Sequence, residues 1–281
     1  MLRESLEYLA IRPDGIYADC TAGLGGHTLA IAQRLTSGLV LACDRDAESL
    51  EIARANSADY LSRIRFLKTS FARVGEALAA VGFSQLDGLL ADLGASRYQL
   101  TSAERGFSFS ADGPLDMRQD RSQPGTAADL VNFESENQLA DLIYQFGEER
   151  RSRRIARAVV RARPIKTTGQ LAKLIEGAVP RTGKLHPATQ TFMALRIAVN
   201  RELEELDALL ESIPRLVKPG GRAVIITFMS LEDRRVKHAF QAMARAGSAE
   251  VLTRHVVRPS EEEIAENAAS RSAKLRAVQL S

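Results

Sequence analysis

The segment that most constrains the fold is DCTAGLGGH, residues 19–27, which follows a short apolar run and contains three glycines. Glycines at such a place let the backbone turn sharply from strand to helix, and they let a ligand lie against backbone amides. A second apolar run, residues 39–43, ends at Asp44, where an acid is placed to accept hydrogen bonds from both hydroxyls of an adenosine ribose. The two signals together predict a pocket for an adenosine-containing cofactor at the carboxyl edge of a parallel sheet.

The spacing of the loop favours one class of cofactor. Gly26 directly follows Gly25 and His27 comes next, so the loop lacks the G-x-G-x-x-G spacing that places a pyrophosphate over a helix N-terminus. S-adenosylmethionine, which has no phosphates, fits this loop better than a nicotinamide dinucleotide. A tight turn that binds no ligand is the alternative that the loop alone leaves open.

Alternation of short apolar runs with amphipathic stretches predicts β-α-β units and therefore an α/β protein with a mainly parallel sheet. The expected strands are residues 16–20, 39–43, 64–68, 86–93 and 222–228, with 249–253 and 274–280 as a terminal antiparallel pair. Residues 94–221 separate the fourth and fifth strands, far more than one crossover helix needs. The sequence thus predicts an insertion.

The insertion begins with a loop rich in Gly, Ser and Asp, residues 106–120, and continues with helical patterns. Its last helix is expected from about Thr189 to Leu216, because apolar residues recur there at helical spacing. We therefore expect a discontinuous sheet domain of residues 1–105 and 200–281, interrupted by a small helical domain of residues 106–199.

The chain has 281 residues, of which 45% are hydrophobic and 26% charged, as is usual for a globular protein. No stretch reads as a membrane span, and the first residues do not resemble a secretory signal, so we expect a cytoplasmic protein. Cys20 and Cys43 lie near strand ends, where small apolar residues pack, and the four histidines show no ligand spacing. Neither a disulfide nor a metal site is expected.

The strongest charge feature is RRSRRIARAVVRARPIK, residues 150–166, with eight basic residues and no acidic one. A helix would place four of these arginines on one face, namely Arg150, Arg154, Arg157 and Arg161. Guanidinium groups in a row suit the phosphate backbone of RNA. The alternative is a solvated helix face whose arginines pair with acids such as Glu148 and Glu149.

Many ordered motifs resemble one family, the bacterial 16S rRNA cytosine-N4 methyltransferases. They are DCTAGLGGH (19–27), CDRD (43–46), DGLLADLGAS (87–96), ERGFSF (104–109), DGPLDMR (112–118), YQFGEERRSRRIA (144–156), HPATQTFMALRIAVNRELEEL (186–206), FMSLEDRRVK (228–237) and SAKLRAVQ (272–279). The resemblance covers nearly the whole chain. It implies a Rossmann-like class I S-adenosylmethionine-dependent methyltransferase domain, an inserted helical domain that helps recognise RNA, and methylation of a cytidine in the decoding region of 16S rRNA in the small ribosomal subunit.

The resemblance also implies site residues. The cofactor contacts carry over to Gly25, Gly26, His27, Asp44, Phe71, Asp92 and Gln99. Phe71 suits the adenine face, although it reads equally well as a core aromatic, and Gln99 also reads as a plain loop residue. A sulfonium is already an activated methyl donor, so the enzyme must chiefly hold the acceptor nitrogen in line with the S–CH3 bond. Asp92, or a group within residues 92–96 that includes Ser96, is the candidate acceptor that orients the cytosine amine.

A target base that leaves its stack is stabilised by aromatic side chains. Tyr98, Phe107 and Phe109 lie in the expected segment, with loop packing as the alternative for the phenylalanines. Asp112, Asp116 and Asp120 fit salt bridges with nearby arginines better than a metal site.

The chain departs from the family pattern at Arg97, Tyr98, Thr101, Gln119 and Met229. Two other interpretations stay open, of which the second would explain the differences at Arg97, Tyr98 and Met229. One is a nucleotide-dependent oxidoreductase, which uses the same β-α-β signals. The other is an RNA-binding protein that retains an inactive methyltransferase fold.

Overall fold

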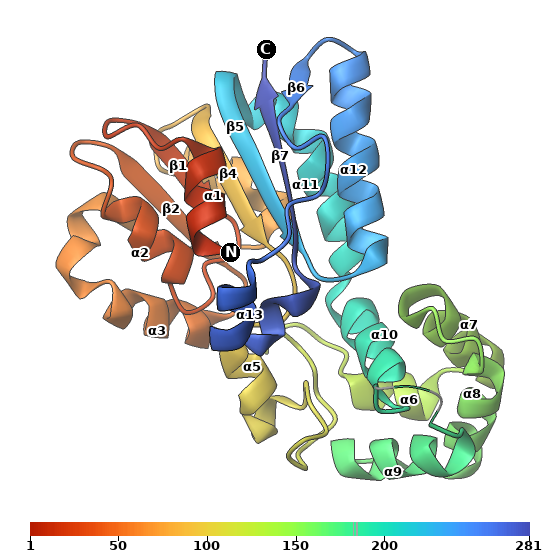
Figure 1. Ribbon diagram of the computed structural model, residues 1–281. Helices are drawn as coiled ribbons and strands as arrows, with labels where there is room; N and C mark the ends of the chain where they lie inside the picture. Colours follow the sequence, from red (N-terminus) through yellow and green to blue (C-terminus); the bar gives the residue numbers. More distant parts are fainter. Residues whose placement is uncertain (182, 184) are drawn as a thin grey trace. The chain divides into compact units, whose positions relative to one another are not determined.

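The computed structural model describes residues 1–181, 183 and 185–281, which form two compact units (Figure 1). The sheet unit consists of residues 1–94 and 203–281, and the helical unit consists of residues 95–202. The sequence suggested boundaries at 105/106 and 199/200. Residues 95–105 belong to the helical unit because the buried side chain of Arg105 donates hydrogen bonds to the carbonyl oxygens of Arg118 and Gln119 at 3.0 and 3.1 Å.

The sheet unit is built on one seven-stranded sheet with the order β3-β2-β1-β4-β5-β7-β6. Its strands are β1 (Ile16–Asp19), β2 (Leu39–Asp44), β3 (Ile64–Lys68), β4 (Leu86–Asp92), β5 (Val217–Thr227), β6 (Ala249–Val251) and β7 (Lys274–Leu280). The first five are parallel, and β7 runs antiparallel to both β5 and β6. The predicted α/β class, the parallel strands and the terminal antiparallel pair are confirmed.

Helices cover both faces of the sheet because alternate strand residues point to opposite sides. Leu41 belongs to a core cluster with residues of α4 (Val74–Ala80), α11 (Glu202–Leu216) and α12 (Ser230–Arg245). Its neighbours Val40 and Ala42 belong to the cluster on the other face, with residues of α1 (Leu2–Leu9), α2 (Gly26–Ala32) and α3 (Ala47–Asn56). The sheet unit also contains η1 (Ala58–Arg63), η2 (Phe71–Arg73), α13 (Glu261–Glu266) and η4 (Ala268–Ser272).

The helical unit has a hydrophobic core of its own, to which α6, α7, α8, α9 and α10 contribute buried residues. Its elements are α5 (Arg97–Thr101), η3 (Ala103–Arg105), α6 (Ala127–Phe133), α7 (Glu136–Gly147), α8 (Ser152–Arg161), α9 (Thr168–Ala178) and α10 (Thr189–Asn200). Capping boxes begin α5, α6, α7 and α9, so the sequence marks these starts locally. No described helix is long and apolar enough to cross a membrane.

The single helix expected over residues 189–216 is wrong, because the chain breaks at Arg201 into α10 and α11. Arg201 adopts a left-handed conformation with φ 52°. The buried side chain of Asn200 stabilises this break, since it donates to the Met117 carbonyl oxygen and accepts from the Gln119 amide, both at 2.8 Å. The break lies beside the boundary between the two units.

Candidate functional site

Three aspartates end neighbouring parallel strands of the sheet unit: Asp44 on β2, Asp19 on β1 and Asp92 on β4. The carboxyl ends of parallel strands meet at one edge of a sheet, which is where ligands bind in open α/β sheets. This edge is therefore the candidate site. Asp44 and Asp92 were expected from the sequence, whereas Asp19 was not.

Asp44 holds the glycine loop in place. One carboxylate oxygen accepts from the Gly23 amide at 2.8 Å, and the other accepts from the Asp46 amide at 2.9 Å. Burial raises the pKa of the Asp44 carboxyl. Because each carboxylate oxygen can accept more than one hydrogen bond, the side chain keeps capacity for the hydroxyls of a ribose.

The glycines of the loop differ in their surroundings. Gly25 has φ 91°, and a Cβ built there would lie 3.1 Å from the Cα of Ala53 on α3, so this glycine is needed for the turn and for close packing. A Cβ built on Gly26 would meet no atom within 4 Å. Gly26 therefore leaves open space beside the backbone where the sequence predicts a ligand.

A hydrogen-bonded chain joins the loop to the end of β4. Asp19 is fully buried and accepts from the Thr28 hydroxyl at 2.7 Å and from the Thr21 amide at 3.2 Å. The Thr21 hydroxyl in turn accepts from the Asp92 amide at 2.6 Å. Burial raises the pKa of Asp19 to about 6. Asp19 and Thr21 thus hold the glycine loop and the backbone of Asp92 in place. In the sequence, the only signal for this role was that both residues belong to the DCT segment before the glycines.

His27 and Asp92 face each other, with 3.7 Å between Nδ1 and Oδ2. Burial lowers the pKa of His27 to about 4 and raises that of Asp92 to about 7. His27 is therefore neutral at pH 7, and Asp92 is poised between its two protonation states. Oδ1 of Asp92 and Nε2 of His27 are buried, and neither has a hydrogen-bond partner among the described residues. Such groups are costly unless a ligand or water satisfies them, so this corner is suited to a polar ligand.

Phe71 begins η2, just beyond β3, and is half-buried against the core cluster that contains Leu41. The next amide, that of Ala72, donates to Glu205 at 3.3 Å. The packing of Phe71 agrees with its interpretation as a core aromatic. Its ring is only partly buried, and its contact with adenine stays a prediction.

Ser96 and Gln99 lie in the helical unit, where they form the capping box of α5. Ser96 Oγ accepts from the Gln99 amide at 3.2 Å, and Gln99 Oε1 accepts from the Ser96 amide at 3.0 Å. Gln99 is buried on a helix, so its interpretation as a plain loop residue is wrong. The structure gives both side chains a structural task, and their proposed roles toward cofactor and substrate stay predictions.

The three aromatic residues that the sequence singled out, Tyr98, Phe107 and Phe109, all pack against other side chains of the helical unit. Phe107 is buried, and its ring centroid lies 5.9 Å from the guanidinium carbon of Arg105. The ring of half-buried Tyr98 lies 6.0 Å from the same atom. Phe109 packs edge-on against Phe192 at 4.9 Å between ring centroids. The loop-packing interpretation fits both phenylalanines, and contact of Tyr98 or Phe107 with a flipped base stays a prediction.

Asp116 pairs with Arg118 at 2.7 Å, as the salt-bridge interpretation of this loop expects. Asp112 instead accepts from the Gly169 amide of α9 at 2.8 Å. No group of three metal-ligating side chains occurs in the part of the chain that the structure describes.

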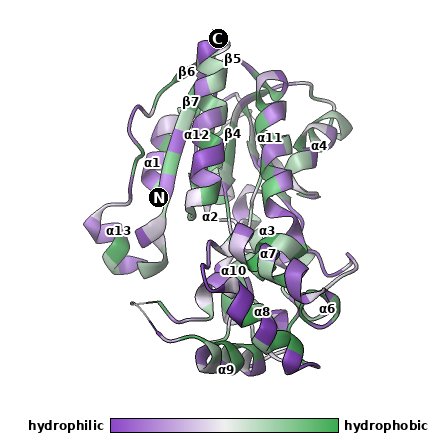
Figure 2. Cartoon of the chain, turned by 90° about the vertical axis from the view of Figure 1, so that its right-hand side faces the viewer, coloured by the Kyte–Doolittle hydropathy of each residue, from purple (hydrophilic) through white to green (hydrophobic). Residues whose placement is uncertain are grey.

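The basic segment forms α8, whose hydrophobic side contains buried Ile155 and Val159, and the alternation with hydrophilic residues is visible in Figure 2. Arg150 lies in the turn before α8, so the expected row of four helical arginines is reduced to Arg154, Arg157 and Arg161. Arg157 pairs with Glu136 at 3.3 Å and Arg151 pairs with Glu149 at 3.2 Å, which matches the alternative interpretation for these two residues. Arg150, Arg154 and Arg161 are exposed and make no ion pair with a described residue.

Comparison with known sequences gives one consistent assignment. The model of the MraW methylase family matches residues 1–281. "Ribosomal RNA small subunit methyltransferase H" of Solibacter usitatus is 60% identical over 280 residues, covering 100% of this chain and 98% of the relative. The protein of the same description from Acidobacterium capsulatum is 49% identical over 289 residues, with 99% and 96% covered. The solved structure of an rRNA methylase from Streptococcus thermophilus aligns over 99% of this chain and 94% of its own, with 10% identity and a TM-score of 0.47.

Proposed function

The chain belongs to the MraW methylase family, and from that premise we propose that it transfers a methyl group from S-adenosylmethionine to N4 of a cytidine in the decoding region of 16S rRNA. Membership of a methyltransferase family decides against the nucleotide-dependent oxidoreductase that the sequence left open. The two relatives are described as methyltransferases of small-subunit rRNA, which supports the substrate class. A ribosomal substrate implies a reaction in the cytoplasm.

The observation that carries the proposal is the carboxyl edge of the sheet, whose groups fit S-adenosylmethionine. Two buried atoms without a hydrogen-bond partner among the described residues, Asp92 Oδ1 and His27 Nε2, are suited to bind a polar group such as the amino-acid part of the cofactor. Asp44 keeps acceptor capacity for ribose hydroxyls, and the space beside Gly26 admits a ligand close to the backbone. When bound, this cofactor supplies an electrophilic methyl group on a sulfonium.

Asp92 has two possible tasks in this proposal, and its environment suits both. The amine of cytosine is a weak nucleophile because its lone pair is delocalised into the ring, and an acceptor for one of its N–H groups helps to localise that pair. Asp92 ends β4 with its backbone fixed by Thr21 and with one carboxylate oxygen unpartnered. In its ionised form it is able to accept from the amine or to bind a cofactor ammonium group. Ser96 stays the second candidate for the acceptor.

We propose the exposed arginines of α8, together with Arg150, as the surface that binds RNA phosphates. Arg154 and Arg161 carry charges that no described carboxylate neutralises, so each is free to pair with a phosphate. The apolar side of α8 is buried in the helical core, and this burial fixes which side the arginines present to solvent.

The decisive experiment is methyl transfer from labelled S-adenosylmethionine to unmodified small ribosomal subunits and to RNA extracted from them, followed by nucleoside mass analysis. We expect N4-methylcytidine at one position of the decoding region. Measurable cofactor binding without any methylated nucleoside would overturn the proposal and favour an RNA-binding protein with an inactive fold.

A further inference from the structure

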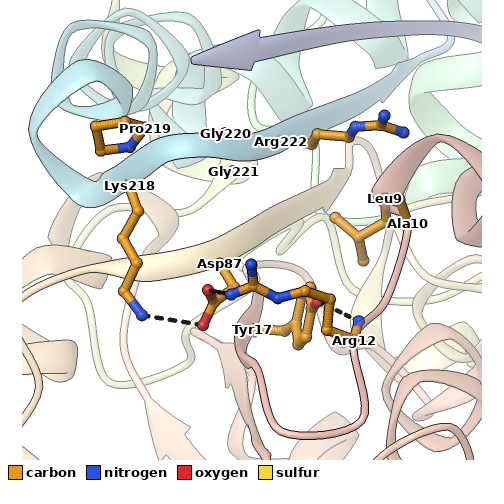
Figure 3. Close-up of a pocket in the computed structure, with 10 residues that line it drawn as sticks. All are labelled: Leu9, Ala10, Arg12, Tyr17, Asp87, Lys218, Pro219, Gly220, Gly221 and Arg222. Atoms are coloured by element: carbon orange, nitrogen blue, oxygen red, sulfur yellow. Dashed lines mark hydrogen bonds and ion pairs between the residues drawn. The ribbon is translucent and has the colours of Figure 1, made fainter. Parts of the chain in front are cut away.

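A pocket of about 140 Å³ opens in the sheet unit at the amino-terminal ends of β1, β4 and β5 (Figure 3). Tyr17 and Asp87 are the second residues of β1 and β4, and residues 218–222 of β5 complete the wall. Asp87 and Asp92 lie at opposite ends of β4, about 17 Å apart at about 3.3 Å per residue. The pocket is therefore remote from the candidate reaction site and has no part in the proposed methyl transfer.

Three cationic side chains line this pocket: Arg12, Lys218 and Arg222. Figure 3 shows Arg12 and Lys218 converging on the carboxylate of Asp87 from two sides. The Asp87 side chain is 6% exposed and also accepts from the Ile16 amide at 2.8 Å. Asp87 thus acts as a buried anchor that fixes the positions of two cations whose side chains are 65% and 42% exposed.

The third cation, Arg222, is hydrogen-bonded to uncharged groups. Its Nε donates to Gln279 Oε1 at 3.0 Å, and its Nη1 donates to the Tyr8 carbonyl oxygen at 3.1 Å. Within the described residues it makes no ion pair. The pocket is thus lined by three cations and one carboxylate, Asp87, and its lining carries a positive surplus.

The remaining lining limits the size of a ligand. Leu9, the Tyr17 ring and Pro219 form the less polar part of the wall. Gly220 also lines the pocket, and it has a left-handed conformation with φ 78°. Pockets for drug-sized ligands measure roughly 300–1,000 Å³, so this pocket is too small for a whole nucleotide. Guanidinium and ammonium donors in a fixed arrangement suit a compact tetrahedral oxyanion.

We propose that this pocket binds a phosphate group. The same chemistry is offered by a backbone phosphate of RNA and by a free phosphate anion, and the two sources are separable by experiment. The proposal does not depend on the proposed methyl transfer, because inorganic phosphate as a probe requires neither RNA nor cofactor.

The test compares the full chain with Lys218→Met, Arg222→Gln and a control, Lys237→Met, which removes an exposed lysine of α12 that does not line the pocket. Thermal unfolding is followed in inorganic phosphate and in chloride at matched ionic strength. A ligand that binds only the folded state raises Tm with its concentration. We expect this rise in the parent chain and in Lys237→Met, and its loss in Lys218→Met and Arg222→Gln. Arg222→Gln leaves the contacts of Asp87 intact, so it tests the pocket even if Lys218→Met folds poorly.

The second arm measures the salt dependence of binding to a fragment of small-subunit rRNA. If the pocket receives an RNA phosphate, Lys218→Met lowers the slope of log K against log salt by about one, while Lys237→Met leaves it unchanged. An unchanged slope together with a phosphate response that depends on Lys218 assigns the site to a free anion. An equal response to phosphate in all four proteins, or no response in the parent chain, overturns the proposal.

Discussion

Oδ2 of Asp92 lies 3.7 Å from Nδ1 of His27, and the second polar atom of each side chain is buried without a partner among the described residues. Asp92→Asn keeps the shape of this corner and removes its negative charge. If Asp92 binds the cofactor, the variant loses cofactor affinity and turnover in parallel. If Asp92 orients the cytosine amine, kcat falls while the cofactor Kd stays near its parent value. Calorimetric titration of the cofactor beside single-turnover kinetics distinguishes the two.

The raised pKa of Asp92, about 7, predicts a pH dependence of cofactor binding. A cationic amino group binds the ionised carboxylate better, so affinity should rise between pH 6 and pH 8. His27, with a pKa near 4, stays neutral throughout this range. Titration at pH 6, 7 and 8 checks the prediction, and Asp92→Asn should remove this rise in affinity. A parent profile that is flat over the same range would exclude Asp92 as the charged partner.

Asp19 should make the folded state less stable as pH rises. Its pKa is raised by burial to about 6, so between pH 4 and pH 6 the folded state holds a proton that the unfolded chain has released. The stabilisation is complete below the unfolded pKa of about 3.9 and is lost as pH rises through 6, with a magnitude of about 3 kcal/mol. Urea unfolding of the parent chain and of Asp19→Asn at pH 4.5, 6 and 7.5 measures it. The variant should show a smaller decrease over this range, and an equal decrease in both proteins would contradict the assignment.

The two adjacent glycines of the loop provide a matched pair. Gly25→Ala places a Cβ 3.1 Å from Ala53 Cα at φ 91°, and we expect a loss of about 2 kcal/mol in unfolding free energy. Gly26→Ala meets no atom within 4 Å and should fold with nearly unchanged stability, yet bind the cofactor more weakly because the methyl group occupies the ligand's side of the loop. Unchanged affinity in Gly26→Ala would show that no ligand approaches this backbone.

Local patterns in the sequence were sufficient for the strands and for part of the site. The strands predicted at 39–43 and 86–93 were placed to within one residue of β2 and β4, because buried parallel strands are short apolar runs. Asp44 and Asp92 were found because each ends such a run. The break at Arg201 was missed because it depends on Asn200 binding the amide of Gln119, which is 81 residues earlier in the chain. Contacts of this kind arise only when distant segments fold together.

The same limit explains the other differences. In the sequence, Asp19 is only the first residue of a glycine-loop motif. Its role becomes visible in the structure, where it accepts hydrogen bonds from Thr28 and Thr21. Arg150 follows the helical spacing of the basic segment but precedes the start of α8 at Ser152, which helical periodicity alone does not define.

Asp44 should be required for the glycine loop as well as for the cofactor. Asp44→Ala leaves the amides of Gly23 and Asp46 without their carboxylate acceptor, and hydrogen bonds to charged groups contribute about 1.5–3 kcal/mol. We expect cofactor affinity to fall by about tenfold to a hundredfold. Asp59→Ala, which removes an exposed carboxylate at the start of η1, is the control and should bind as the parent chain does.

The arginines of α8 should differ in their contributions to RNA binding according to their partners. Arg154 and Arg161 make no ion pair within the described chain, whereas Arg157 lies 3.3 Å from Glu136. Arg154→Ala and Arg161→Ala should each lower the slope of log K against log salt by about one if each contacts a phosphate. Glu136→Gln is the matched comparison, because it removes the partner of Arg157 without removing a cation and should leave affinity unchanged or increase it. Slopes equal to that of the parent chain in both arginine variants would remove α8 from the RNA surface, because an exposed cation that contacts a phosphate must release counterions when it binds.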